Sequence, residues 1–290
     1  MHTKTPPFAQ LRTAYPLAHA HAPSLIWLRQ MHSVGGDLPK LQSAPLALQK
    51  IWSATTQNKI NNMRKKQKPV LVIGDCHAPA MHPKYIPFLK KIHKKHNCGR
   101  VVHIGDIVDW AALSYHEKEA FMPNPVDEFK EAQKQVKALH KAFPKADLLI
   151  GNHDSLPSRK ASNLGLPEEV LRDFDRLWQL DGWTVHPRYH DLIIDDVIYR
   201  HGDKGKGGVM AAYKNAIAEF SSVVQGHLHA QAGVVYHANK EECVFGLQVG
   251  CGVDHDHPAM NYGRVYSAKP ILGCGVVYSP QQAFFEPLFL

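Results

Sequence analysis

The fold can be worked out from one stretch of the chain, VVHIGDIVD at residues 101–109. Its first four residues are mostly apolar and β-branched, and they are followed directly by Gly105 and Asp106. A short run of this kind predicts a buried strand. The glycine predicts a tight turn, which places Asp106 just beyond the carboxyl end of that strand.

The same pattern occurs twice more, at Val70–Ile73 before Gly74-Asp75 and at Leu148–Ile150 before Gly151-Asn152. Helical periodicity is present between and after these runs, at Pro83–His96, Val126–Phe143 and Glu168–Leu180. Short apolar runs that alternate with helices predict buried parallel strands.

The later part of the chain is rich in predicted strands, with a single helix among them at Val209–Phe220. These strands are Leu192–Ile194, Val197–Tyr199, Val223–Val224, Gly233–Tyr236, Val244–Val249 and Ile271–Tyr278. We expect them to form a second, more antiparallel sheet. The predicted class is therefore α/β, a two-sheet β-sandwich flanked by helices.

The first 70 residues differ from the rest in charge. They contain ten lysines and arginines and one acid, Asp37, whereas the whole chain has a net charge of +8. Residues 71–290 are therefore close to neutral. We interpret residues 1–69 as a basic extension, partly helical or flexible, and residues 70–290 as one domain. A basic extension indicates either nucleic-acid contact or a solvated arm that binds another partner.

Composition also limits the compartment. The five cysteines are odd in number and none forms a C-x-x-C pair, which argues against a disulfide framework or a thiolate zinc site. No run of about 18 apolar residues predicts a membrane span, and the N-terminus lacks an uninterrupted apolar signal segment. We expect a cytoplasmic protein with reduced thiols and no membrane partner.

Polar residues follow the carboxyl ends of five predicted strands. They are Asp75 and His77; Asp106 and Asp109; Asn152, His153 and Asp154; His201; and His227 and His229. Ligands of open α/β sheets bind at this edge. Seven of these are candidate ligands: Asp75, Asp106, Asn152, His77, His201, His227 and His229. Two carboxylates, one amide and four imidazoles are too many for a single tetrahedral zinc. They suit two ions that share one carboxylate, and such nitrogen and oxygen ligands suit Mn²⁺, Fe or Zn²⁺.

The five motifs together resemble the calcineurin-like metallophosphoesterase superfamily. They are Gly74-Asp75-Cys76-His77, Gly105-Asp106-Ile107-Val108-Asp109, Gly151-Asn152-His153-Asp154, His201-Gly202 and Gly226-His227-Leu228-His229, in the order of that superfamily. The resemblance implies a metallophosphoesterase fold and a hydrolase that acts on phosphate esters with two divalent cations. Mn²⁺ is the cation we expect to support activity in vitro.

The resemblance also implies roles. Asp75, His77 and His229 would bind the first cation, and Asn152, His201 and His227 the second, with Asp106 bridging them. His153 would protonate the leaving oxygen or stabilise the transition state. Asp154 would orient His153 through a hydrogen bond, and Asp109 would support the ligands from behind.

One departure from the superfamily concerns substrate choice. Many phosphomonoesterases of this kind have arginine directly after the G-D-x-x-D motif, where this chain has Trp110. We therefore expect a phosphodiesterase that acts on nucleotide or nucleic-acid-type diesters. The alternatives are a phosphomonoesterase for small phosphorylated metabolites and a catalytically dead nucleic-acid-binding protein. A cation from Arg159, Arg188, Arg200 or Arg264 would favour the first of these alternatives.

Other features carry less weight. The glycine-rich stretch Gly202–Gly208 lacks the serine or threonine of a P-loop, but it follows His201 and could border the substrate. The run Asp254–His257 is metal-like in composition, and we interpret it as a solvated loop. His103 is expected to pack in the core. Trp110 and Tyr115 could either stack on a base or pack.

Overall fold

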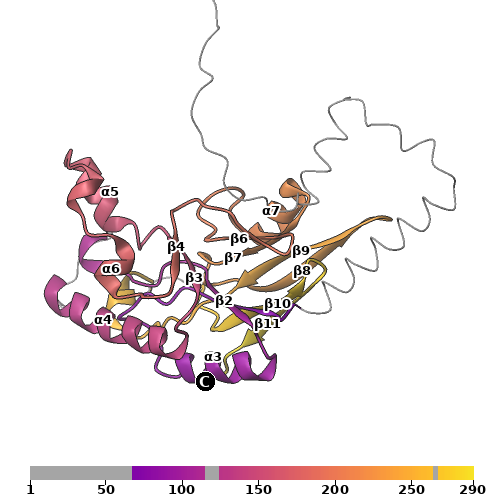
Figure 1. Ribbon diagram of the computed structural model, residues 1–290, viewed down its shortest axis with the longest axis horizontal. Coiled ribbons are helices and arrows are strands. Elements are labelled where there is room, and N and C mark those ends of the chain that lie inside the picture. The colour runs from indigo at the N-terminus through magenta and orange to yellow at the C-terminus, as the bar shows by residue number, and fades with distance from the viewer. Residues whose placement is uncertain (1–66, 115–123, 264–266) are drawn as a thin grey trace, which may run out of the picture. The chain divides into compact units, whose positions relative to one another are not determined.

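The computed structural model describes residues 67–114, 124–263 and 267–290 (Figure 1). Its strands are β1 (Val70–Ile73), β2 (Arg100–His103), β3 (Asp147–Leu149), β4 (Thr184–His186), β5 (Leu192–Ile194), β6 (Val197–Arg200), β7 (Ser222–Gln225), β8 (Ala232–Ala238), β9 (Cys243–Val249), β10 (Gly273–Ser279) and β11 (Gln282–Pro287). They form two sheets, with the orders β11-β10-β1-β2-β3-β4 and β5-β6-β7-β9-β8.

The first sheet confirms the predicted parallel strands. β1, β2, β3 and β4 are parallel neighbours, while β10 pairs antiparallel with β1 and β11 with β10. Ile271–Tyr278, expected in the second sheet, instead contributes β10 to the first. Val276 and Val277 face opposite sides of that sheet and are both buried, so the strand needs a position covered on both faces.

The second sheet is less antiparallel than expected. β6, β7 and β9 are parallel, and only the edge strands β5 and β8 run antiparallel. The physical reason is the helix α7 (Ala211–Glu219), which carries the chain back from the end of β6 to the start of β7. Such a crossover produces a parallel pair, whereas a short turn produces an antiparallel one.

The helical elements also include α3 (Tyr85–Lys95), η2 (Ala111–Leu113), α4 (Pro125–Ala142), α5 (Leu156–Asn163), η3 (Glu168–Val170), α6 (Phe174–Trp178) and η4 (Pro258–Gly263). The structure confirms the predicted helices at α3, α4 and α7. The predicted helix Glu168–Leu180 is wrong, because the chain is extended at Leu171 and Asp173 between η3 and α6. This break lets Trp178 pack against Phe129 of α4. The sequence analysis did not identify α5, β4 or β11.

Alternation along β1 shows how the layers are built. Leu71 and Ile73 face a cluster that includes residues of α3 and α4, whereas Val70 and Val72 face a cluster between the two sheets. Ile198 of β6 and Val223 of β7 pack against Ala216 of α7. The order of layers is therefore α3 with α4, first sheet, second sheet, α7, which confirms the predicted sandwich (Figure 1).

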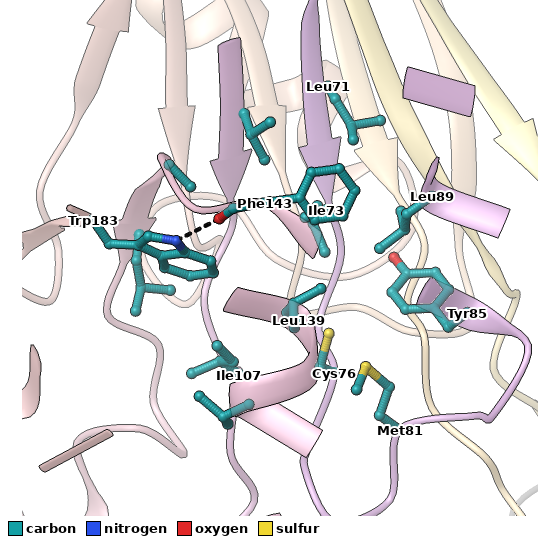
Figure 2. Packing of buried hydrophobic residues seen from close by; sticks show 14 of the residues in the cluster. Leu71, Ile73, Cys76, Met81, Tyr85, Leu89, Ile107, Leu139, Phe143 and Trp183 are labelled. Carbon is teal, nitrogen blue, oxygen red and sulfur yellow. Dashed lines mark hydrogen bonds between the residues drawn. The ribbon is translucent and has the colours of Figure 1, made fainter. Parts of the chain in front are cut away.

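The core beneath the first sheet is fixed by polar as well as apolar contacts (Figure 2). The indole Nε1 of Trp183 donates to the carbonyl oxygen of Phe143 at 2.7 Å. The buried hydroxyl of Tyr85 donates to the carbonyl oxygen of Gly273 at 2.8 Å and accepts from the backbone N–H of Gly74 at 3.1 Å. Tyr85 thus holds the turn at the end of β1.

Two expectations about the environment can be compared with the structure. All five cysteines are free thiols, as expected. Within the described part of the chain, no helix is both long enough and apolar enough to cross a membrane. Most of the basic extension, residues 1–66, lies outside the described residues, so its partly helical character stays a prediction.

Candidate metal centre

The ten residues identified from the sequence all lie in loops that follow strand ends. The loops after β1, β2 and β3 belong to parallel neighbours of the first sheet, and those after β6 and β7 to parallel neighbours of the second. Their carboxyl ends therefore meet at one edge of the sandwich. Hydrogen bonds or close polar contacts connect all ten residues, so the structure brings every one of them together.

Two groups of three donor side chains could each hold a cation. Asp75, His77 and His229 form the first group, and Asp106, His201 and His227 form the second. In each group, one ligand atom from every residue lies within 4.8 Å of the others. Asn152, the seventh predicted ligand, has Oδ1 3.0 Å from Nε2 of His201. Each of these groups contains three of the predicted ligands, and a further group, His77 with Asp109 and His153, shares His77 with the first.

Asp106 lies between these two groups. Its Oδ2 is 3.2 Å from Nε2 of His201 in the second group and 3.7 Å from Nε2 of His77 in the first. A carboxylate with two oxygens can serve two ions at such a position. Oδ2 of Asp106 therefore lies near both groups, while its Oδ1 accepts from the backbone N–H of His153 at 2.8 Å.

Buried atoms without hydrogen-bond partners test whether cations fit. Asp75 Oδ1 and His77 Nε2 are buried and have no partner among the described residues. Buried polar atoms in proteins are almost always paired. The other nitrogen of His77, Nδ1, lies 2.7 Å from Asp109 Oδ1, and Nδ1 of His201 donates to the carbonyl oxygen of Ile104 at 3.0 Å. These contacts direct each Nε2 toward the predicted ligands, where that of His77 has no partner and that of His201 lies beside Asn152 and Asp106. The residues therefore fit a metal site.

Two glycines of the motifs make room for the carboxylates. A Cβ atom at Gly151 would overlap Oδ1 of Asp106, and one at Gly226 would overlap Oδ1 of Asp75. Any other residue at either position would displace a ligand. The glycines are therefore needed for close approach of the backbone to the ligands, in addition to their role in turns.

Three ligands have a left-handed backbone, which is unusual for residues other than glycine. The φ angles are 48° at His77, 50° at Asp106 and 67° at His227. Trp110, directly after Asp109, has a φ of 54°. Such residues cost of order 1–3 kcal/mol each and persist only where neighbouring contacts hold them. The contacts that hold these loops are therefore part of the site.

The electrostatics keep the central carboxylates ionised. Burial would raise the pKa of Asp106, but the positive charge and hydrogen bond of His201 hold it well below the usual range. Burial acts likewise on Asp75, where the hydrogen bond from His229 and the charges of His201 and His229 together outweigh it, so the pKa is lowered. Burial and the nearby His153 lower the pKa of His77. The centre combines buried negative charge with an imidazole that favours its neutral, ligating form.

His153 is held by Asp109. Its Nδ1 donates to the carbonyl oxygen of Asp109 at 2.9 Å and lies 3.1 Å from Oδ1 of the same residue. Burial would lower the pKa of His153, but the hydrogen bond and charge of Asp109, with the charge of Asp106, raise it to about 10. Burial opposes ionisation of Asp109, yet its bonds to His153 and His77 lower its pKa to about 2. His153 thus favours the protonated form and keeps Nε2 available.

The hydrogen bond predicted from Asp154 to His153 is wrong. Asp154 instead accepts from three backbone N–H groups, those of Asp106 at 2.7 Å, Gly151 at 2.9 Å and Val108 at 3.1 Å. Burial, and then the charge of Asp106, raise the pKa of Asp154. The reason is backbone direction: the two loops aim their N–H groups at one buried point, and only an acceptor can fill it.

Trp110 packs in the outer layer. Its ring lies 6.0 Å from that of Phe129 and 5.4 Å from that of Trp178, between centroids. It also lines a cavity of about 480 Å³, whose other lining residues are a mixture of apolar ones, such as Leu171 and Phe174, and charged ones, such as Arg172 and Arg188. Ile150 and Asp154, which precede and follow the Gly151 turn, line the same cavity. The cavity therefore adjoins the ligand loops.

The arginines considered as substitutes for the missing one differ in position. Nη1 of Arg159 donates to the carbonyl oxygen of the ligand Asn152 at 3.4 Å. Arg188 is paired with Asp203 at 2.7 Å, and the buried Arg200 is paired with Asp191 and Glu219. Arg264 lies outside the described residues. Of the three that are described, Arg159 contacts the backbone of a predicted ligand, and Arg188 contacts Asp203 in the loop after His201.

The remaining residues that the sequence singled out are not part of the two donor groups. Asp254, His255 and Asp256 form a partly exposed group outside both ligand sets, in keeping with the solvated loop that we expected. His103 is buried in the core as predicted, where its Nδ1 accepts from the backbone N–H of Gly105 at 3.2 Å. Tyr115 lies outside the described residues.

Sequence reasoning did not identify three buried amides behind the second-sheet ligands, Asn215, Gln225 and Gln248. Gln248 donates to the carbonyl oxygen of Gly226, in the turn that carries His227. No motif marks these residues, because Gln225 and Gln248 lie within apolar strands and Asn215 within a helix. Their only signal in the sequence is a polar residue at a position where an apolar one would be expected.

A comparison with protein families gives a match to one described as calcineurin-like phosphoesterase, over residues 68–240. The matched segment contains all ten site residues. A comparison with curated proteins found no match.

Solved structures with a similar fold include an archaeal phosphodiesterase, with 14% identity, a TM-score of 0.39, and coverage of 76% of this chain and 99% of that one. Vacuolar protein sorting 29 from Cryptosporidium parvum has 13% identity and a TM-score of 0.41, covering 77% of this chain and 92% of that one. The phosphoesterase Yfce from E. coli has 14% identity and a TM-score of 0.37, covering 74% and 96%.

Proposed function

Because the chain belongs to the calcineurin-like phosphoesterase family, a family of metal-dependent phosphoester hydrolases, we propose that it hydrolyses phosphodiesters with two divalent cations. The observation that carries the proposal is the pair of donor groups with Asp106 between them. Mn²⁺ is the cation that we expect to support activity, and Fe or Zn²⁺ would also suit these ligands. A catalytically dead protein would have broken ligands, and all seven are present.

The proposed mechanism assigns roles to the residues of the chain. Asp75, His77 and His229 would hold one cation, and Asn152, His201 and His227 the other, with Asp106 shared. Two bound cations would supply the positive charge that binds the phosphoryl group and lowers the pKa of an attacking water.

His153 would donate a proton from Nε2 to the leaving oxygen. Asp109 supports this role, because it occupies Nδ1 of His153 and stabilises the protonated ring. Asp109 also holds Nδ1 of His77, so one carboxylate would orient both a ligand and the proton donor. We assign Asp154 to the backbone of the ligand loops and no longer to His153.

Preference for diesters is supported by Trp110. A phosphomonoester is a dianion near neutral pH and gains from an added arginine, which Trp110 does not supply. A diester has a single negative charge and a second organic group. The cavity beside Trp110 could accept such a group, and aromatic rings stack well on nucleobases. Nucleotide or nucleic-acid-type diesters are therefore the proposed substrates.

A phosphomonoesterase is the second candidate, and Arg159 favours it. Its guanidinium lies beside Asn152 and could bind a free phosphoryl oxygen. The test compares kcat/KM for bis(4-nitrophenyl) phosphate and 4-nitrophenyl phosphate, which share a leaving group, at saturating Mn²⁺. A higher kcat/KM for the diester is expected. A higher value for the monoester that falls in Arg159→Ala would establish the second candidate.

The basic extension and the cellular location complete the proposal. We propose that residues 1–69 contact nucleic acid and that the protein acts in the cytoplasm. Contacts to phosphates release counterions, so binding of the full chain to DNA or RNA should weaken steeply as salt is raised. Binding that does not depend on salt would argue against this role.

A further inference from the structure

Three buried carboxamides form a continuous chain of hydrogen bonds behind the second-sheet ligands. Nδ2 of Asn215, on α7, donates to Oε1 of Gln225 at 2.8 Å. Nε2 of Gln225, at the end of β7, donates to Oε1 of Gln248 on β9 at 3.2 Å. The three residues are 2%, 0% and 6% exposed, respectively. The mechanism above uses none of them.

One end of this amide chain acts on the turn that carries His227. Nε2 of Gln248 donates to the carbonyl oxygen of Gly226 at 2.5 Å and lies 3.4 Å from that of Leu228. These two carbonyls belong to the residues on either side of His227, whose φ is 67°. The N–H of His227 donates to Oδ2 of Asp75 at 2.9 Å. Asp75 therefore holds the left-handed backbone of His227 through its own N–H, and Gln248 holds it through the carbonyl oxygens of Gly226 and Leu228.

The other end holds the glycine-rich loop that begins at Gly202, directly after His201. Oδ1 of Asn215 accepts from the backbone N–H of Lys206 at 2.7 Å, and Nδ2 donates to the carbonyl oxygen of Lys206 at 3.2 Å. Gly205 packs against the same amide, since a Cβ there would lie 2.7 Å from Oδ1 of Asn215.

A second anchor fixes the far part of this loop. Oε1 of Gln231 accepts from the N–H of Met210 at 2.9 Å, and its Nε2 donates to the carbonyl oxygen of Gly208 at 3.3 Å. Gln231 is two residues after His229. The glycine-rich loop is thus tied to both segments that carry the second-sheet ligands.

We propose that Asn215, Gln225 and Gln248 are positioning residues, which hold the His227 turn and the glycine-rich loop in one arrangement. The loop then forms one wall of the phosphoester site. The positioning of the His227 turn concerns cation binding alone, whereas the role of the glycine-rich loop as a wall of the site rests on the proposed function. Amides suit the task because each both donates and accepts. A carboxylate at position 248 could not donate to the carbonyl oxygen of Gly226.

The first test measures binding of Mn²⁺ alone to metal-free protein by isothermal titration calorimetry. Gln248→Met keeps the volume but removes the donor. We expect it to weaken Mn²⁺ binding at one of the two sites by about 10–100-fold, as for other residues that orient metal ligands. Mn²⁺ affinity equal to wild type in a folded Gln248→Met protein would overturn the proposal.

A triple variant separates positioning from mere stability. Gln248→Met leaves Nε2 of Gln225 unpaired, so its Tm should fall. Adding Gln225→Met and Asn215→Leu to Gln248→Met removes every side-chain amide of this hydrogen-bond chain, including Nδ2 of Asn215, which donates to Gln225, and should recover part of the Tm. Affinity for Mn²⁺ should stay low, because the carbonyl oxygen of Gly226 then keeps only the backbone N–H of Leu228 as a donor and the tie to β9 is lost. Recovery of affinity together with Tm would show a structural role only, and would overturn the proposal.

The loop is tested by Asn215→Leu. Without its anchor at Lys206 the loop should hold substrate less well, raising KM about tenfold, the worth of one hydrogen bond of about 1.4 kcal/mol, while Mn²⁺ affinity changes little. An unchanged KM would contradict the proposed wall. Asn124→Ala, which removes the N-cap of the distant helix α4, is the control: it should lower Tm without changing Mn²⁺ affinity or KM.

These readouts also distinguish this inference from the proposed function. If the wild-type protein hydrolysed no phosphoester while Gln248→Met still lost affinity for Mn²⁺, the activity would be refuted and the positioning role of Gln248 supported.

Discussion

The ligand loops of the two sheets are held in place by opposite chemistry. After the first sheet, the carboxylate of Asp154 accepts from three backbone N–H groups in two loops. After the second sheet, the carboxamide of Gln248 donates to the carbonyl oxygen of Gly226. The two side chains have equivalent roles, because each holds a loop with a predicted ligand in the left-handed conformation. That residue is Asp106 for Asp154 and His227 for Gln248.

The difference arises from which backbone groups face the side chain: N–H groups face Asp154, and carbonyl groups face Gln248. Buried N–H groups need an acceptor and buried carbonyls need a donor. An acid and an amide are therefore not interchangeable here. The first-sheet side also contains buried titratable groups, such as Asp154 and His103, whereas Asn215, Gln225 and Gln248 do not titrate. We expect the first-sheet side to respond to pH and the second-sheet side to respond mainly to loss of a donor.

The largest effect is expected where the two sides meet, at Asp106. Asp106→Ala removes the carboxylate that lies between both donor groups. We expect loss of bound Mn²⁺, measured as metal per chain after dialysis, and a fall in kcat/KM beyond the effect of removing His153. Glu131→Ala, at an exposed position, is the control. Two ions per chain in the Asp106 variant would contradict the bridging role.

Removing His153 should affect the chemistry and leave the cations bound. His153→Ala is expected to lower kcat by about 10²–10⁴-fold, the usual contribution of a general acid, with metal content unchanged. The loss should be greatest for substrates with poor leaving groups, because these need the proton most. The control is His140→Ala on α4, where the ring contacts the carbonyl oxygen of Asp181 and none of the predicted ligands. Normal turnover of an ester with a poor leaving group would show that His153 is not the proton donor.

Asp154 tests the first-sheet half of the comparison directly. Asp154→Ala leaves three buried N–H groups unpaired, at about 1–3 kcal/mol each. We expect the free energy of unfolding to fall by about 3 kcal/mol or more and Mn²⁺ affinity by about 10–100-fold. Asp154→Asn, which keeps one acceptor oxygen, should lose less of both. Equal losses in Asn and Ala variants would mean that the charge, and not the acceptor, holds the loops.

His103 gives the smallest expected effect, a dependence of stability on pH. Burial lowers its pKa to about 3, below its usual value near 6.5, so the unfolded chain binds an additional proton as pH falls below 6.5. Stability is therefore present above pH 6.5 and is lost as pH falls, by about 1.4 kcal/mol per unit, or about 2 kcal/mol at pH 5. Urea unfolding in EDTA should show a shallower pH dependence for His103→Gln. The same dependence of unfolding free energy on pH in both proteins would show that His103 does not cause it.

Much of the site could be predicted because its residues follow the strands in a regular way. A short apolar run, a glycine and a polar residue are local features. Four such patterns, together with His201-Gly202, indicated both the sandwich and the residues that gather at its edge. Their grouping into two sets of three donors agrees with the structure, while the cation-binding and catalytic roles stay predictions. Parallel strands make this inference work, since they deliver their carboxyl ends to one edge.

Contacts between distant segments could not be predicted in this way. Asp154 follows His153 in the chain, which suggested a hydrogen bond between them. In the structure, Nδ1 of His153 instead contacts Asp109, which lies in another loop. The pairing of β10 with β1 and the break between η3 and α6 likewise depend on which surfaces remain to be covered after the sheets pack. Gln248 has no motif because its partners, Gly226 and Gln225, are 22 and 23 residues away. Short-range pattern predicts the candidate ligands of this protein, and packing across the two sheets decides which residues hold their loops.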